Sequence, residues 1–175
     1  TAVKGKVNNN TQISADKNIN ITGSNGIENK KSVQSTLGDI VISSKNGNIK
    51  NTADIEAENK LTVATGSGDI ESSGELKSTG GNIAVEATEG TINLKKINAN
   101  KDAKVVSTKG AINIAEGLSG TNLNVLATEG KVTALNLTSG ADLNITTGTG
   151  DIESNGELKS TGGNIAVEAT EGTIN

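Results

Sequence analysis

The residues best suited to chemistry are two matching clusters of carboxylates: Asp69, Glu71 and Glu75, and their repeat Asp151, Glu153 and Glu157. Paired carboxylates act as general acid and base in glycoside hydrolysis, and carboxylate oxygens also bind calcium. Catalysis needs desolvation and a fixed separation, which nothing around these residues supplies, and the nonapeptide period of calcium-binding repeats is absent. We therefore interpret both clusters as a solvated acidic face.

Composition removes most other chemistry. The 175 residues include no Cys, His, Met, Pro, Trp, Tyr or Phe, and every basic residue is Lys. Without Cys or His there is no thiolate nucleophile, no imidazole base and no ordinary zinc site. A net charge of −4, with neither Arg nor stacking aromatics, argues against nucleic-acid binding. The sequence predicts no catalytic, cofactor-binding or metal-binding residue, and a protein that is not an enzyme.

Two surface roles depend on Asn and Thr. The glycosylation pattern Asn-x-Thr occurs at residues 9–11, 20–22, 136–138 and 144–146, but such matches arise by chance in a chain rich in both residues, so glycosylation stays open. An ice-binding face would need paired threonine files on many coils, but the sequence has only one short threonine file. No apolar run of about 20 residues is present, and the chain reads as an internal segment of something longer.

The elements that position these residues follow from internal repeats. Residues 65–93 return as residues 147–175 with two differences, an offset of 82 residues. A shorter unit, Gly-x-Ile/Val, lies inside this repeat. Its corner glycines include Gly47, Gly68, Gly90, Gly110, Gly130 and Gly150. Its apolar anchors include Ile49, Ile70, Ile92, Ile112, Val132 and Ile152. The anchors recur every 20 to 22 residues, so four coils make the 82-residue unit.

Each coil repeats one internal plan. A second apolar position follows the anchor by five or six residues, at Ile13, Val33, Ile55, Leu76, Ile97, Leu118, Leu137 and Leu158. An alternating apolar pair comes next, as in Ile83 and Val85, and alternation at period two indicates a strand. Asn25 replaces the corner glycine in one coil, which we interpret as a second residue able to adopt left-handed backbone.

This plan predicts an all-β fold, a right-handed parallel β-helix with three short strands per coil of 20 to 22 residues. Residues 1–175 form one such segment, about 40 Å long if coils stack at the strand spacing. Near-constant coil length leaves no room for an inserted loop, so we expect no walled cleft, and a carbohydrate-active β-helix enzyme is the less favoured alternative.

Stacking in register predicts ladders of like or complementary side chains. Thr88, Thr108 and Thr128 share one file, and Asn93 and Asn113 another, so their polar groups can bond along the rod. Charges alternate in two further files: Glu89, Lys109 and Glu129, and Glu28, Lys50 and Glu71.

The coil spacing, seen in GDIESSGELKSTGGNIAVEATE from Gly68 to Glu89, resembles that of the filamentous haemagglutinin family of bacterial two-partner secretion. The resemblance covers essentially the whole chain. It implies export through an outer-membrane secretion partner and folding at the surface of a Gram-negative bacterium, either secreted or surface-attached. It also implies a host or neighbouring-cell receptor or glycan as partner of the parent protein.

We thus expect a structural and adhesive rod segment, with the stalk of a contact-dependent toxin-delivery protein as the alternative. Both ends of the coil stack would expose unpaired strand edges, so we also expect end-to-end self-association.

Overall fold

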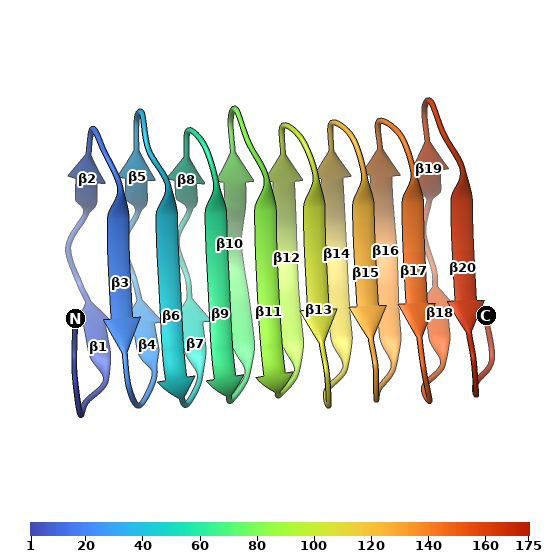
Figure 1. The fold of residues 1–175 in the computed structure, drawn as a ribbon, viewed down its shortest axis with the longest axis horizontal. Coiled ribbons are helices and arrows are strands. Elements are labelled where there is room, and N and C mark those ends of the chain that lie inside the picture. Colours follow the sequence, from blue (N-terminus) through green and yellow to red (C-terminus); the bar gives the residue numbers. More distant parts are fainter.

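The computed structural model describes all 175 residues as one β-solenoid of eight coils without any helix. All strand pairs are parallel, and each strand pairs with its counterparts in the adjacent coils. In Figure 1 the front strands run downward and the rear strands upward while the chain advances from N to C, so the winding is right-handed. This confirms the predicted fold class and the period of about 21 residues.

Coils 1 to 8 follow one another along the chain. Coils 1 to 3 contain β1 (Val7–Asn9), β2 (Ile13–Ala15), β3 (Ile19–Gly23), β4 (Ile27–Asn29), β5 (Val33–Ser35), β6 (Ile40–Asn46), β7 (Ile49–Asn51), β8 (Ile55–Ala57) and β9 (Leu61–Ser67). Coils 4 to 7 contain β10 (Ile70–Ser78), β11 (Ile83–Glu89), β12 (Ile92–Ala99), β13 (Ala103–Ser107), β14 (Ile112–Ser119), β15 (Leu123–Ala127), β16 (Val132–Ser139) and β17 (Leu143–Thr147). Coil 8 contains β18 (Ile152–Ser154), β19 (Leu158–Ser160) and β20 (Ile165–Ala169).

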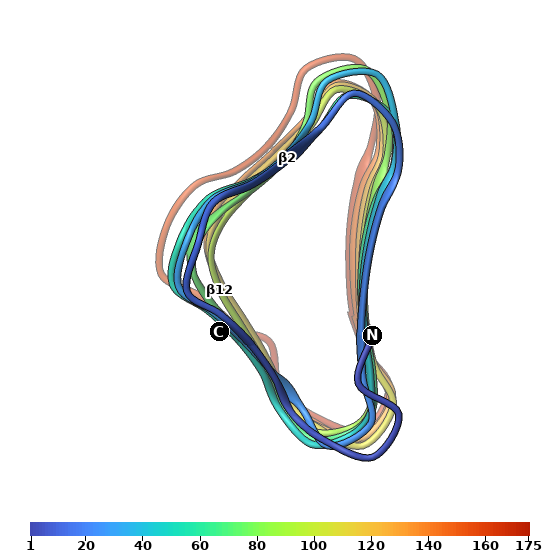
Figure 2. The same cartoon turned by 90° about the vertical axis from the view of Figure 1, so that its left-hand side faces the viewer.

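Three strands per coil hold only at the two ends of the rod. In coils 4 to 7 the first and second strands merge into one long strand, so β10 pairs with both β7 and β8, and β16 pairs with both β18 and β19. Figure 2 shows the consequence, because the corner beside β12 is drawn inward relative to the outermost coils. The rod is therefore triangular at its ends and flatter in the middle.

In coils 5 to 7 the merging follows from one residue at this corner, whereas β10 of coil 4 keeps the extra residue and continues as one strand through a register shift. Coil 4 places Leu76 six residues after Ile70, whereas coil 5 places Ile97 only five after Ile92. The register accordingly shifts between Ser72 and Glu75, where β10 carries an extra residue. A coil that lacks the extra residue has too little chain to turn the corner, so its strand runs straight through.

The core consists of files of aliphatic side chains, in which each residue stacks on its counterpart in the next coil. Each of the predicted anchors is at most 1 % exposed: Ile49, Ile70, Ile92, Ile112, Val132 and Ile152. They pair directly, for example Ile70 with Ile92 and Ile112 with Val132. Because like residues stack on like, the aliphatic core is continuous along the rod.

Leu118 was assigned wrongly to the second apolar file. The structure pairs Gly117 with Ile97 and Leu137, and Leu118 points outward with 44 % of its surface exposed. The five-residue spacing of coils 5 to 7 turns Gly117 toward the core. The side chains of Leu137 and Leu123 occupy the space that a side chain at this position would need. A period-based assignment cannot detect a glycine in a core file.

The interpretation of Asn25 is also wrong. No residue other than glycine has a positive φ, and in that coil Gly26, with φ of 114°, adopts the left-handed conformation instead. Gly47 has φ of 109°, and a Cβ there would lie 2.8 Å from the Asn25 carbonyl oxygen. Gly68, Gly90 and Gly130 also have positive φ, whereas Gly110 and Gly150 do not and are instead packed closely against the preceding glycine corner. Close approach of the backbones is thus the requirement that all six corners share.

Candidate functional site

The acidic clusters do not form a catalytic pair. The Asp69 carboxylate accepts a hydrogen bond from the Thr91 N–H at 2.8 Å, so it caps the next coil. Glu75 instead lies 3.7 Å from the Lys96 ammonium, and Glu71 forms no ion pair or hydrogen bond. These three carboxylates therefore share no partner with one another, although Glu116 also lies 3.7 Å from the Lys96 ammonium.

The repeat of this cluster makes partly different contacts. Asp151 accepts hydrogen bonds from the N–H and the hydroxyl of Thr173, both at 2.9 Å, and these bonds lower the pKa of the Asp151 carboxyl. Glu153 lies 2.5 Å from the Lys131 ammonium. Asp151 and Glu153 are thus charged acceptors that tie one coil to a neighbour, and the lowered pKa of Asp151 keeps its carboxyl ionised rather than poised for proton transfer.

Such capping is general along the rod. The residue just before the first inward-facing apolar residue of a strand is often Asp or Asn. Its side-chain oxygen accepts a hydrogen bond from the backbone N–H of the corresponding residue in the next coil. Asp102 shows the strongest case: it accepts the Thr121 hydroxyl at 2.6 Å and the Asn122 N–H at 3.1 Å, and these bonds lower its pKa. The Asp and Asn of the repeats therefore have a structural use that periodicity alone did not reveal.

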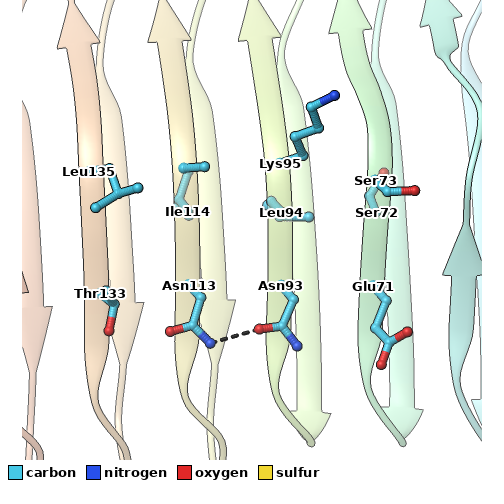
Figure 3. Close-up of a pocket in the computed structure, with 11 residues that line it drawn as sticks. Glu71, Ser72, Ser73, Asn93, Leu94, Lys95, Asn113, Ile114, Thr133 and Leu135 are labelled. Carbon is cyan, nitrogen blue, oxygen red and sulfur yellow. Dashed lines mark hydrogen bonds between the residues drawn. The ribbon is translucent and has the colours of Figure 1, made fainter.

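The threonine file is placed as its spacing predicts, but its hydroxyls do not bond to one another. Backbone hydrogen bonds put Thr88, Thr108 and Thr128 in successive coils, with the Lys109 N–H donating to the Thr88 carbonyl at 3.2 Å. All three side chains are exposed. The asparagine file does bond, because the Asn113 amide donates to the Asn93 carbonyl oxygen at 2.7 Å (Figure 3).

The charge files are partly as expected. Lys109 lies 2.8 Å from Glu89, and this contact lowers the pKa of the Glu89 carboxyl and raises the pKa of the Lys109 ammonium. Glu28 stacks in register with Lys50, yet its ion pairs are with Lys6 at 2.7 Å and Lys30 at 3.1 Å. A lysine side chain is long enough to choose a diagonal partner, which register alone cannot predict.

Besides smaller hollows near Asn48 and near Asn82, the surface has one hollow that is lined by several apolar side chains and has no wall formed by an inserted loop. It is open and shallow, about 450 Å³, and lies over the merged strands β10, β12, β14 and β16. Its wall includes a row formed by Glu71, Asn93, Asn113 and Thr133, beside Leu94, Ile114 and Leu135 (Figure 3). Glu71 is the only carboxylate that lines it, so a pair of carboxylates for acid and base catalysis is not assembled here.

The hollow was missed because it results from the flattened corner of coils 5 to 7. The signal was present in the sequence, as the shorter spacing between Ile92 and Ile97 and between Val132 and Leu137. No group of three or more Asp and Glu side chains is arranged to hold a metal ion, and the chain forms no helix long and apolar enough to cross a membrane.

Comparison with known proteins assigns the chain to a family through a match that spans nearly its whole length. No curated protein and no solved structure matches it significantly, and no match identifies it as a filamentous haemagglutinin. One family model, described as Toastrack DUF4097, matches residues 3–175. The chain therefore belongs to the Toastrack DUF4097 family of β-solenoid domains.

Proposed function

We propose that the chain is a structural rod within a large secreted or surface-displayed bacterial protein of adhesin type. One observation carries the proposal: parallel pairing connects every coil from β1 to β20, with an aliphatic core inside and coil-to-coil capping outside. Such a stack transmits load along its axis because each coil contacts only its neighbours, and it lengthens by adding coils.

The polar exterior supports a spacer more than a reactive surface. Eight ion pairs join lysines to acids, and most of them connect neighbouring coils, as Lys77 does with Glu56 and Lys131 with Glu153. These exposed pairs each contribute little, but they place opposite charges where like charges would repel. A receptor or glycan would then be bound by the parent protein, which an outer-membrane partner would export from a Gram-negative cell. The stalk of a toxin-delivery protein is the same physical object with another cargo.

The 82-residue repeat allows a sharp test of the spacer role. Deletion of residues 65–146 joins residue 64 to Thr147, which takes the place of Thr65, so four coils are removed without a break in register. We expect the shortened rod to fold and to lose about 19 Å of length, at about 4.8 Å per coil. Duplication of residues 65–146 is the matched control, and it should lengthen the rod by the same amount.

Both variants are to be compared in the parent protein on bacterial cells, by surface labelling and by binding to host cells. Export of both variants, with binding that follows the number of coils, would support a spacer. Binding that is unaffected by length, or a chain that stays inside the cell, would contradict the proposal. A glycan-degradation assay tests the enzymatic alternative. Glycan turnover that is lost when residues 65–146 are deleted would contradict the structural role of the rod.

A further inference from the structure

Two corners of the rod contain the same dipeptide, asparagine followed by glycine. Asn25-Gly26 forms the corner before β4, and Asn46-Gly47 forms the same corner one coil later, before β7. Both asparagine side chains are exposed, and the two glycines have similar positive φ angles of 114° and 109°. The dipeptide and its backbone handedness are thus shared, so any difference in reactivity has to come from the hydrogen bonds around each corner.

At the second corner the glycine nitrogen is bonded into the ladder between coils. The Gly47 N–H donates to the Ser67 carbonyl oxygen of the next coil. Asn46 itself belongs to β6, where it pairs in register with Ser67, and its N–H donates to the Ser24 carbonyl at 2.8 Å. The ladder therefore continues through this corner and holds both residues of the dipeptide.

At the first corner the glycine nitrogen has no partner. Strand β3 ends at Gly23, so Asn25 and Gly26 lie between strands, and no oxygen accepts a hydrogen bond from the Gly26 N–H. Chain covers this corner on both sides. The Asn25 N–H donates to the Gly5 carbonyl at 3.2 Å, and a Cβ on Gly26 would lie 2.8 Å from the Asn48 carbonyl oxygen. The free N–H is therefore a feature of a corner inside the stack of coils.

The Asn25 side chain is also open to water. It lines a hollow together with Lys6 and Lys50, and Glu71 is the one acid in the lining. Its amide nitrogen donates to the Lys4 carbonyl at 3.3 Å, a long hydrogen bond. A carboxylate at residue 25 would have two ammonium groups nearby, so the site accepts the charge that loss of the amide creates.

We propose that Asn25 is a site of spontaneous deamidation and that Asn46 is protected from it. The Gly26 nitrogen, having given its proton to hydroxide, attacks the side-chain amide carbon of Asn25, which no Cβ on glycine obstructs. The new carbon–nitrogen bond closes a succinimide ring, and the side-chain nitrogen leaves as ammonia. Water then opens the ring, which leaves a carboxylate on aspartate or on isoaspartate. The balance is one amide and one water consumed, with one carboxylate and one ammonium formed.

The same attack at Asn46 requires a prior step. The Gly47 N–H has to leave the Ser67 carbonyl, and the ladder has to open locally before the nitrogen can reach the side chain. We expect this opening to slow the reaction at Asn46 about tenfold, the order of one backbone hydrogen bond and its neighbours. This inference goes beyond the proposed rod role, since it concerns a modification of one corner.

Peptide mapping reads both sites in one experiment. Trypsin cleaves after lysine and places Asn25 in residues 18–30 and Asn46 in residues 46–50. After incubation of the folded chain in mildly alkaline buffer, mass spectrometry should show conversion about tenfold faster at Asn25 than at Asn46. The chain unfolded in urea is the control, and there the two sites should convert at similar rates because glycine follows both.

Glutamine variants assign the product, because glutamine would need a larger ring to react. They are made with Asn155→Ser, which removes the third asparagine–glycine pair and restores the serine of the matching position, Ser73. Deamidation adds one negative charge to the net charge of −4, so ion-exchange chromatography resolves the product. Asn25→Gln should abolish this acidic species, whereas Asn46→Gln should leave it.

Three results would overturn the proposal. They are equal conversion at the two sites of the folded chain, faster conversion at Asn46, and a folded chain in which Asn25 stays intact while it converts in urea. Circular dichroism spectra of both glutamine variants should match that of the parent chain, because both side chains are exposed.

Discussion

The same corner of the solenoid is built in two ways. In coils 1 to 3 the inward-facing residue is Asn9, Asn29 or Asn51, and their amides form a buried ladder of hydrogen bonds, both 2.6 Å long. In coils 5 to 7 the same file contains Leu94, Ile114 and Ala134. The first version turns the chain between two short strands, and the second lets one long strand pass straight through.

The difference shows how one file of side chains sets the shape of the cross-section. Where the backbone leaves the sheet at a corner, its polar groups need new partners, and Asn51 supplies one by donating to the Ala53 carbonyl at 2.6 Å. Ser72 continues the ladder by accepting from Asn51 at 2.8 Å and donating to the Gly74 carbonyl. Apolar residues cannot do this, so in coils 5 to 7 the backbone bonds stay within the sheet.

The largest effect should come from moving an amide into the apolar corner. Ile114→Asn leaves a buried side chain between Leu94 and Ala134 with no amide to bond, and it removes an aliphatic contact. We expect the free energy of unfolding to fall by about 3–5 kcal/mol. Chemical denaturation measures this loss, with Ile114→Val as the control that should cost about 1 kcal/mol. A loss near that of the control would mean that the corner tolerates either chemistry.

The ladder itself can be broken from the other side. Asn29→Ala removes the donor to Asn51 and the acceptor of Asn9, which leaves both neighbours buried and unsatisfied. The free energy of unfolding should fall by about 2–3 kcal/mol. Asn113→Ala is the matched variant, because it removes the same kind of amide bond from the half-exposed outer face, and it should cost about 1 kcal/mol or less. Equal losses would show that burial does not distinguish the two files.

The smallest effect concerns the surface charges of coil 2. Hydrogen bonds and charge from Lys6 and Lys30 lower the pKa of Glu28 to about 2. A lowered pKa stabilises the fold above the usual value near 4.5, and this contribution is lost as the pH falls toward 2. Lys6→Gln should raise the pKa of Glu28 measured by NMR titration. Lys31→Gln removes an exposed lysine of the same coil that forms no ion pair, and it should leave that pKa in place.

Periodicity was enough to predict the fold class, the coil length and the anchor residues, because these depend on a strict two-residue alternation repeated eight times. Features that depend on one residue more or less were not predicted. Leu118 was misplaced because its coil is shorter at the corner, and the hollow over β12 and β14 has the same cause. The hydroxyls of Thr88 and Thr108 were expected to bond, yet they are exposed to water, which competes for them.

Nuclear Overhauser effects in the 175-residue chain test the stacking most directly, since every proposed role depends on residues 20 to 22 apart lying side by side. The account predicts methyl contacts between Ile27 and Ile49 and amide contacts between the side chains of Asn29 and Asn51, with none between Asn93 and Asn51. Antiparallel contacts between strands adjacent in the sequence, such as β2 with β3, would contradict it.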